Sequence, residues 1–508
     1  MSAQDVFDLM VIGGGINGAG IARDAVGRGL SVLLAEQHDL AQATSSASSK
    51  LIHGGLRYLE YYEFRLVREA LKEREVLLAM APHIIRPLSF VLPHEPHLRP
   101  AWMIRTGLFL YDHLGGRRRL PASSAVDLRR SPVGRPLADR LERGFIYSDC
   151  WVDDARLVAL TARDAADRGA CIRTRTRVEA AKRADGLWRV RLAEESGMRQ
   201  EVTARGLVNA AGPWVSDMLS HIEGVRSQSN VRLIKGSHIV LPRLYEGEQA
   251  YILQNDDRRI VFVIPYEGRF TLVGTTDEPF QGDPASVRIS AAETQYLCDV
   301  VSGHFAQAID PADIVWSYAG VRPLHDDARL SASAVTRDYA FDVDGAPGEP
   351  PLLSVFGGKI TIYRRLAEHA LEKLAPFFPH LGPAWTETSS LPGGGFENAD
   401  FVGFLDGFSR DHPWLPASLA ERLARSYGTE AATIVGSARS LAELGRDFGL
   451  GLSERELGHL VAHEFARKAE DVLWRRSKLG LHLGAEAATE LDAWLRGRTD
   501  SKTGGEAA

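Results

Sequence analysis

The sequence predicts an α/β chain with three parts: a domain built on a parallel sheet, an inserted antiparallel sheet and a helical C-terminal domain. Three observations lead to this prediction. A strand, a glycine-rich turn, a helix and a second strand follow one another within residues 7–36. β-Rich segments recur across 231–275, and 415–497 has helical composition with many charges. A βαβ unit makes its strands parallel, whereas short strands joined by tight turns pair as antiparallel hairpins.

The N-terminal βαβ unit is defined by apolar runs and glycines. Phe7–Ile12 is a short apolar run typical of a buried strand, and Ser31–Glu36 is a second. Between them, Ile16–Arg28 has helical composition and stops at Gly29, a residue type that commonly ends helices.

The turn between the first strand and the helix carries the pattern Gly13-x-Gly15-x-x-Gly18. The first glycine permits the tight turn, the second lets the backbone approach a pyrophosphate, and the third lets helix and strand pack closely. The N–H groups at the helix N-terminus favour phosphate, and the carboxylate of Glu36 is placed to hold ribose hydroxyls. We therefore predict a Rossmann-type dinucleotide site. The acidic Glu36 disfavours NADP without separating NAD from FAD.

The remaining elements follow from composition and periodicity. Residues 62–80 predict an amphipathic helix, and 82–136, rich in Pro, Gly, His and Arg, predict irregular structure. Asp256-Asp257 and Glu267-Gly268 are predicted hairpin turns of the inserted sheet. Further predicted elements are β-rich segments over 170–212, a helix near 290–308, strands near 313–321 and 352–356, a helix from Gly357 to about 374, and a linker at 392–395.

Composition excludes several classes of protein. The 508 residues carry a net charge of −6, which argues against a general nucleic-acid binder. The cysteines Cys150, Cys171 and Cys298 are too far apart for a zinc knot or a disulfide framework, which favours a reducing compartment. The N-terminal segment runs directly into the first strand, which predicts no signal peptide. No run of 18 apolar residues occurs, which predicts no membrane-spanning helix.

Small residues follow two later predicted strands. Asn209–Trp214 (NAAGPW) comes after one apolar strand, and Gly357-Gly358-Lys359 comes after another. Such positions allow the backbone to approach a flat ligand closely, but two ordinary tight turns would have the same composition. Spacing alone leaves both interpretations open.

Several longer motifs resemble those of one family, the FAD-dependent glycerol-3-phosphate dehydrogenases. The resemblance closely follows the aerobic bacterial enzyme and covers nearly the whole chain, including the helical C-terminal part. Ile362 stands where the family commonly has a second threonine, a small departure. The matching motifs are Ile12–Gly20, Thr44–Leu59, Tyr147–Leu157, Lys235–His238, Gly320–Leu324 and Ser354–Lys359.

The resemblance implies a fold of the D-amino-acid-oxidase type and FAD as cofactor. It also implies electron delivery to a membrane quinone by a cytoplasmic protein attached to the inner face of the cell membrane, and it allows a homodimer. The expected domains are FAD-binding (1–90, 145–230 and 345–388), substrate (91–144 and 231–344) and helical C-terminal (389–498), followed by a disordered tail (499–508).

The motifs also imply which residues contact FAD. Glu36 and the glycine-rich turn hold the nucleotide half, while Lys50, Thr361 and backbone near Gly358 meet the flavin ring edge. His53 lines the ring. The full expected set is Gly13, Gly15, Gly18, Glu36, Thr44, Ser45, Ser49, Lys50, Leu51, His53, Gly54, Ala211, Gly212, Trp214, Gly358, Lys359, Ile360 and Thr361.

A small dianionic substrate, glycerol 3-phosphate, needs fixed cationic donors. We expect Arg57, Tyr58, Arg322 and Lys359 to bind it. Oxidation at C2 requires a proton acceptor, and His238, in the substrate sheet, is the expected base. Two alternatives stay open at this point: His238 is a structural histidine, or Arg322 stabilises the alkoxide without a dedicated base.

Other functions remain to be weighed against a quinone-linked dehydrogenase. An oxidase using O2 on the same substrate and an amino-acid oxidase of the same fold are enzymatic alternatives. A flavin-binding regulator without catalysis is an alternative of a different class. A zinc site is rejected, because His463-Glu464 is followed by Arg467 where the H-E-x-x-H pattern needs histidine.

Two segments are candidates for surface attachment. Apolar and aromatic residues from Trp102 to Tyr111 precede Arg117–Arg119, a combination that suits a membrane interface, although the segment could instead pack over the substrate domain. The pairs Arg467-Lys468 and Arg475-Arg476 could face anionic lipid or a partner subunit.

Overall fold

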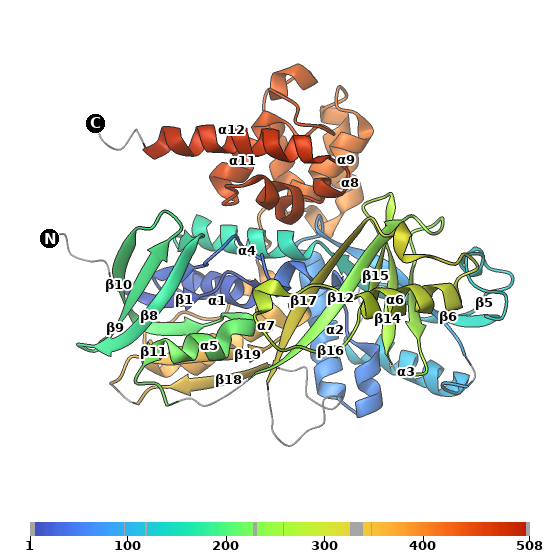
Figure 1. Ribbon diagram of the computed structural model, residues 1–508, viewed down its shortest axis with the longest axis horizontal. Helices are drawn as coiled ribbons and strands as arrows, with labels where there is room; N and C mark the ends of the chain where they lie inside the picture. The colour runs from blue at the N-terminus through green and yellow to red at the C-terminus, as the bar shows by residue number, and fades with distance from the viewer. Residues whose placement is uncertain are drawn as a thin grey trace.

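The computed structural model describes residues 6–95, 97–116, 119–226, 231–257, 259–325, 339–346 and 348–503, with side chains up to 498. Two sheets lie side by side, and a group of helices from the C-terminal part lies above them (Figure 1). The predicted combination of a Rossmann-type domain, an antiparallel domain and a helical C-terminal domain is confirmed.

The first sheet contains the predicted βαβ unit. β1 pairs in parallel with β2 on one side and β10 on the other, and β10 pairs in parallel with β19. The strands assigned to this sheet within the described residues are β1 (Val6–Ile12), β2 (Val32–Ala35), β7 (Cys171–Arg173), β8 (Thr176–Ala184), β9 (Leu187–Glu194), β10 (Arg199–Asn209), β11 (Ile222–Glu223), β18 (Tyr339–Asp344) and β19 (Leu352–Gly357).

Three helices cover one face of this sheet. α1 (Ile16–Gly27) lies between α4 (Asp154–Asp167) and α7 (Tyr363–Leu374). Leu9 and Val11 of β1 pack against these helices and are fully buried. A short helix, α5 (Val215–Ser220), follows β10.

The second sheet is mostly antiparallel. β12 is a long strand near one end of the sheet and pairs with β15, β16 and β17. Its strands within the described residues are β3 (Leu51–Ile52), β4 (Ile85–Pro93), β5 (Ser124–Asp127), β6 (Arg143–Val152), β12 (Val231–Pro242), β13 (Ala250–Gln254), β14 (Ile260–Tyr266), β15 (Phe270–Gly274), β16 (Glu278–Pro279) and β17 (Trp316–His325). α2 (Phe64–Met80), α3 (Ala101–Leu114) and α6 (Ala291–His304) accompany this sheet.

The prediction of irregular structure over 82–136 is wrong, because β4, α3 and β5 lie within that segment. Proline misled the interpretation. β4 contains Pro87, but β13 pairs with β4 only at Phe90 and Val91, so the missing N–H of Pro87 costs little.

The expected domain boundaries also need correction. β3, β4 and β6 begin or lie in ranges assigned to the FAD-binding domain, yet they pair within the second sheet. β18 lies in the range assigned to the substrate domain, yet it pairs with β19 in the first sheet. Composition does not reveal which sheet a strand joins, because that depends on partners distant in sequence.

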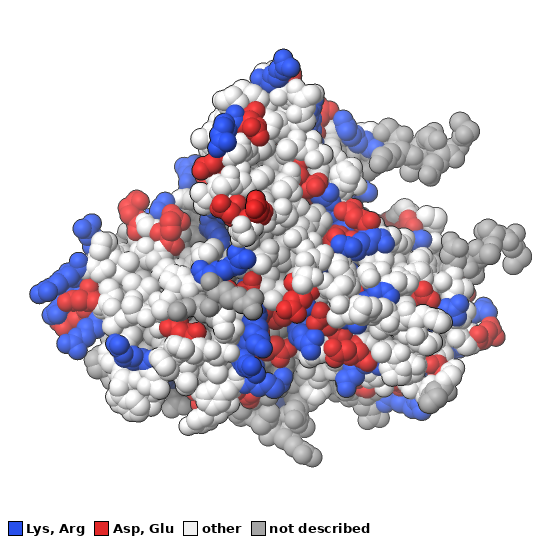
Figure 2. Space-filling model, turned by 180° about the vertical axis from the view of Figure 1, so that it is seen from behind, with Lys and Arg blue, Asp and Glu red and all other residues white. Residues whose placement is uncertain are grey.

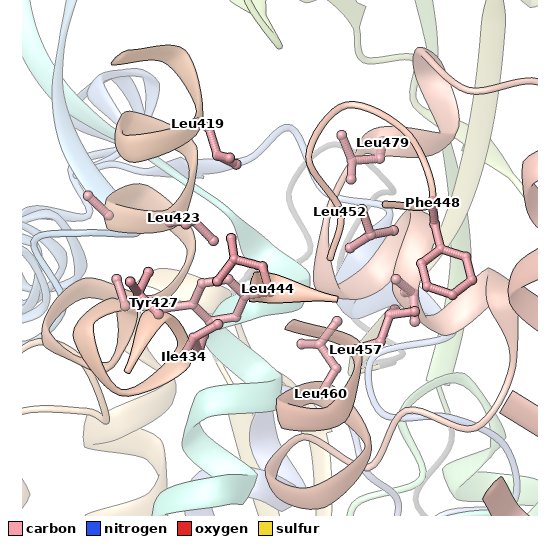
Figure 3. Close-up of a cluster of buried hydrophobic side chains, with 14 of the residues drawn as sticks. Leu419, Leu423, Tyr427, Ile434, Leu444, Phe448, Leu452, Leu457, Leu460 and Leu479 are labelled. Atoms are coloured by element: carbon pink, nitrogen blue, oxygen red, sulfur yellow. The ribbon is translucent and has the colours of Figure 1, made fainter. Parts of the chain in front are cut away.

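The C-terminal helices enclose a hydrophobic core of their own (Figure 3). Leu423, Leu457 and Leu460 point into it from two of the helices. The elements are α8 (Phe401–Asp411), α9 (Ala417–Tyr427), α10 (Ala431–Val435), α11 (Glu454–His463), the π-helical turn η13 (Asp471–Arg476) and α12 (Ala485–Thr503). Because α12 continues through Thr503, disorder from residue 499 is not what the structure shows; residues 504–508 lie outside the described part.

A buried ionic cluster joins the C-terminal domain to the first sheet. The carboxylate of Asp39 accepts hydrogen bonds from Arg476 at 2.7 and 2.8 Å and from Arg475 at 2.6 Å. Burial alone would raise the pKa of Asp39, but these two guanidiniums hold that pKa below its usual value. The expectation that Arg475-Arg476 face lipid or a partner subunit is therefore wrong.

The surface carries charges of both signs. Lys and Arg alternate with Asp and Glu over the face seen in Figure 2, with uncharged stretches along its lower edge. In the described part of the chain, no helix combines the length and apolarity needed to cross a bilayer. No cluster of His, Cys, Asp and Glu among those residues is suited to a metal ion.

Candidate functional site

Three parallel strands end at the same edge of the first sheet, and small residues follow each of them. Gly13 follows β1 with φ +105°, and a Cβ there would lie 2.6 Å from the carbonyl oxygen of Ala210, which follows β10. Asn17 of α1 donates to the carbonyl of Gly357, the last residue of β19, at 3.2 Å. The backbone of all three turns is therefore held together at the N-terminus of α1.

The N-terminus of α1 presents donors for a phosphate. A Cβ at Gly18 would lie 2.0 Å from the carbonyl oxygen of Gly13, so this position admits glycine alone. The N–H of Ile16 donates to Ser45 Oγ at 3.0 Å. Glu36 accepts from the N–H of Gly14 at 2.6 Å, and burial raises the pKa of this carboxyl. Helix N–H groups, a hydroxyl and a carboxylate match the pyrophosphate and ribose of a dinucleotide.

A cavity of about 1120 Å³ opens at this point, which is large enough for an extended dinucleotide. Nine of the expected cofactor residues line it: Gly13, Gly15, Glu36, Thr44, Ser45, Lys50, Ala211, Gly212 and Trp214. Trp474, Arg475 and Lys478 of the C-terminal domain also line it. That contribution could not be predicted from sequence patterns, because nothing local links residues 470–478 to the nucleotide turn.

The other expected cofactor residues are not part of the cavity lining. Leu51 and Gly54 are buried. The N–H of His53 donates to Thr361 Oγ1 at 3.3 Å, which brings the segment after β3 against η7 (Ile360–Ile362), the short helix that follows Gly358 and Lys359. The ammonium of Lys50 is committed to Asp154 at 2.7 Å, in a buried pair that the sequence did not predict.

One face of the second sheet carries a row of side chains directly across four strands. Tyr318 of β17 lies opposite His238 of β12, which lies opposite Gly274 of β15, which lies opposite Phe262 of β14. The His238 ring stacks on Tyr318 with centroids 4.7 Å apart, and His53 meets Phe262 edge-on at 6.3 Å. The His238 ring lies over Gly274, and His53 contacts the next residue in the row, Phe262.

His238 is almost fully buried. Its Nε2 lies 2.9 Å from Ser49 Oγ, and its Nδ1 has no hydrogen-bond partner among the described residues. Burial, together with the charges of Lys50 and Arg322, lowers the pKa of His238 to about 3. The imidazole is therefore neutral at physiological pH.

The three expected cations are half-buried and belong to two neighbouring groups. The guanidinium of Arg322 lies over Gly236, two residues from His238 on the same face of β12, and contacts Asp277 at 3.0 Å. The ammonium of Lys359 lies 3.7 Å above the ring of Tyr58. Arg57, next in the chain, lies 3.5 Å from the hydroxyl of Tyr61.

The two groups come together because β17, which carries Arg322, runs beside β19, which leads to Lys359. His325 of β17 meets Phe356 of β19 with ring centroids 5.7 Å apart. The strand that carries Arg322 is therefore a neighbour of the strand that leads to Lys359. Sequence patterns did not identify three supporting residues: Tyr318, Asn17 and Asp154. Asn17 and Asp154 lie inside motifs named above, whereas nothing in the local sequence marks Tyr318.

Comparison with known proteins gives consistent matches. Residues 8–364 match the family described as FAD dependent oxidoreductase, and 384–496 match the C-terminal domain of alpha-glycerophosphate oxidase. The chain is 58% identical over 493 residues to a glycerol-3-phosphate dehydrogenase of Pseudomonas aeruginosa, covering 97% of this chain and 95% of the relative. It is 52% identical over 496 residues to a D-erythritol 1-phosphate dehydrogenase of Brucella abortus, covering 97% and 99%.

A solved structure also matches nearly the whole chain. The glycerol-3-phosphate dehydrogenase from Bacillus halodurans complexed with FAD has a TM-score of 0.77 and 27% identity, covering 98% of this chain and 94% of that one.

The close contact at Gly18 predicts that Gly18→Ala weakens FAD binding about tenfold to hundredfold, because the added methyl forces α1 away from β1. FAD content after purification and the dissociation constant of re-added FAD measure the effect. Gly303→Ala is the matched control, since a Cβ there meets nothing within 4 Å. Equal FAD affinity in both variants would contradict the assignment of this turn.

Proposed function

Because the chain belongs to the family of FAD-dependent glycerol-3-phosphate dehydrogenases, we propose that it oxidises sn-glycerol 3-phosphate to dihydroxyacetone phosphate and passes the electrons to a membrane quinone. FAD is its cofactor. The observation that supports the substrate most directly is the position of Arg322 near the neutral His238, on a strand that runs beside β19, which leads to Lys359.

The proposed division of labour follows from the residues. FAD supplies the acceptor for a hydride from C2, at its N5 atom. Arg57, Arg322 and Lys359 bind the phosphate, since a dianion needs fixed cationic donors. The row of side chains on the second sheet encloses the carbon skeleton and excludes water.

His238 is the proposed acceptor of the C2 hydroxyl proton. The buried imidazole of His238 is neutral at physiological pH, and stacking on Tyr318 fixes the plane of the ring. The low pKa of the free site disfavours the protonated ring, but a bound phosphate dianion beside Arg322 would offset the positive charges that contribute to it. Arg322 then stabilises the alkoxide as it forms.

The test of the proposed function is anaerobic addition of glycerol 3-phosphate to the FAD-loaded protein. We expect complete loss of the visible flavin absorbance, and its recovery when a quinone analogue is added. D-Erythritol 1-phosphate is tested in parallel, because a relative that is 52% identical to this chain is named D-erythritol 1-phosphate dehydrogenase.

The other outcomes each identify a different function. Bleaching by a D-amino acid but not by glycerol 3-phosphate would make the protein an amino-acid oxidase. Rapid peroxide formation in air would make it an oxidase. A larger kcat/KM for D-erythritol 1-phosphate would change the substrate, and no bleaching by any substrate would leave a flavin-binding regulator.

A second prediction concerns the proton acceptor. His238→Ala is expected to slow single-turnover flavin reduction about a hundredfold or more. Because the pKa of His238 is about 3, its neutral form persists above about pH 4, so an acid limb of kcat/KM near pH 6 must come from the second ionisation of the substrate phosphate.

The acid limb of kcat/KM near pH 6 should therefore remain in His238→Ala. His97→Ala, at an exposed histidine, is the control for loss of an imidazole. If the limb vanished in His238→Ala, the histidine would titrate near pH 6 and the low pKa would be wrong. If the rate were unchanged, Arg322 would act without a dedicated base.

Membrane attachment on the inner, cytoplasmic face is part of the proposal, and α3 is the proposed contact. Its inner side buries Ile104, Leu108 and Tyr111. Its outer side exposes Trp102 by 67% and Phe109 by 60%, and Tyr62, in the neighbouring turn, is 80% exposed. Large exposed aromatic side chains on an amphipathic helix favour insertion at the lipid interface. Arg117 and Arg118, part of the predicted basic run, lie outside the described residues.

This attachment predicts that Trp102→Ser with Phe109→Ser weakens binding to anionic phospholipid vesicles about a hundredfold or more, since each aromatic ring buried in lipid contributes roughly 1.5–3 kcal/mol. Vesicle co-sedimentation measures it. Val402→Ser removes an equally exposed apolar side chain from α8 and should bind like wild type. Undiminished binding of the double variant would place the contact elsewhere.

A further inference from the structure

Tyr111 is a polar side chain on the inner side of α3 and contacts the turn that carries the proposed phosphate ligands. Tyr111 is 3% exposed, and its hydroxyl donates to the carboxylate of Asp149 on β6, 2.8 Å from either oxygen. The same hydroxyl accepts a hydrogen bond at 2.8 Å from the backbone N–H of Gly54. The helix that exposes Trp102 and Phe109 outward is thus hydrogen bonded inward to the turn after β3.

Asp149 is the centre of a fully enclosed cluster. Besides Tyr111, it accepts from Arg74 of α2 at 2.7 Å and, over a longer 3.4 Å, from the N–H of Gly54. Arg74 also donates to the carbonyl of Ser148 at 2.9 Å. Asp149 and Arg74 are 2% and 4% exposed, so this charge pair is shielded from solvent. A buried, charged acceptor makes the Tyr111 hydrogen bond strong and directional.

The turn that this cluster holds carries the expected phosphate ligands. Gly55 follows Gly54 in the left-handed region at φ +74°, and η2 (Leu56–Tyr61) then places Arg57 and Tyr58. On the other side of Gly54, the N–H of His53 is fixed by Thr361. The segment is therefore anchored through two successive backbone N–H groups. The N–H of His53 donates to Thr361, on the cofactor side, and the N–H of Gly54 donates to Tyr111 of α3.

α3 and this turn both pack closely against the same side chain, Leu71. A Cβ at Gly54 would lie 2.5 Å from Leu71 of α2, and a Cβ at Gly115, which ends α3, would lie 2.3 Å from the Cβ of the same Leu71. α3 and the turn thus press against one side chain from two directions. Because close-packed interiors transmit displacements, a shift of α3 must be felt at Gly54.

We propose that Tyr111, together with Asp149 and Arg74, is a positioning device that couples lipid contact of α3 to the affinity of the phosphate-binding turn. The inference rests on the proposed function and adds regulation of the same site by the lipid surface. Lipid contact holds α3 in the position that presents Arg57 and Tyr58 to the phosphate. Tyr111 acts through Gly54 and does not touch the substrate.

The test measures the dissociation constant of the product, dihydroxyacetone phosphate, from the change it causes in the flavin spectrum. Vesicles of phosphatidylglycerol and phosphatidylethanolamine are expected to tighten product binding to the FAD-loaded wild type about fivefold or more, and the product must strengthen vesicle binding by the same factor. Tyr111→Phe should weaken product binding about tenfold and abolish the vesicle effect. Its limiting rate of flavin reduction should stay near that of wild type.

Tyr266→Phe is the matched control, because the Tyr266 hydroxyl is buried without a hydrogen-bond partner among the described residues. It removes the same atom and should keep both the affinity and the vesicle effect. FAD content and thermal midpoint verify folding of each variant. Asp149→Asn, which keeps the shape but cancels the charge, is the second variant and should also lose the vesicle effect.

The proposal is overturned if vesicles that bind the wild type leave its product affinity unchanged. It is equally overturned if Tyr111→Phe and Asp149→Asn respond to vesicles as Tyr266→Phe does. Neither result touches the proposed function, which depends on bleaching of the wild-type flavin by glycerol 3-phosphate.

Discussion

The whole site depends on the convergence of three parallel strand ends. β1, β10 and β19 are far apart in sequence, but parallel pairing brings their carboxyl ends to one edge of the first sheet. Glycine at the turns lets α1 begin directly against that edge, so helix N–H groups face the space where a pyrophosphate binds. β19 then leads into Lys359 and Thr361. The backbone arrangement proposed to hold the nucleotide half of FAD therefore also positions the residues proposed to meet the flavin ring.

The second sheet supplies the opposing wall, and glycines make that wall concave. A Cβ at Gly274 would lie 2.1 Å from the His238 ring, and one at Gly236 would lie 2.5 Å from the Arg322 guanidinium. Strand-interior glycines allow such close approach at the cost of local strand stability. The result is a buried imidazole and a cation lying flat on one sheet face. This explains why His238 is neutral: burial desolvates the ring, and Lys50 and Arg322 place positive charge near it.

Much of this arrangement could be predicted from the sequence, for physical reasons that differ by element. The βαβ unit and Glu36 were predictable, because local periodicity and a short motif specify them. The positions of His238, Arg322 and Lys359 came from the family resemblance, since no local rule places them side by side. β4 and α3 were missed because proline and mixed composition masked their periodicity. The pairing of Lys50 with Asp154 could not be foreseen, because it joins residues 104 apart through tertiary packing.

The C-terminal domain shows most clearly what motif analysis leaves out. Asp39 stands three residues after Glu36, and its two arginine partners come from η13, more than 430 residues later. On the other side of the same loop, the N–H of Ala41 donates to the carbonyl of Gly14 at 3.1 Å. The loop that follows Glu36 is thus held between the glycine-rich turn and a separate domain. A buried charge left without its partner is costly, so the two arginines of η13 stabilise the position of this loop. The helical domain therefore contributes to the wall of the cavity both through this loop and through Trp474 and Lys478, which line it.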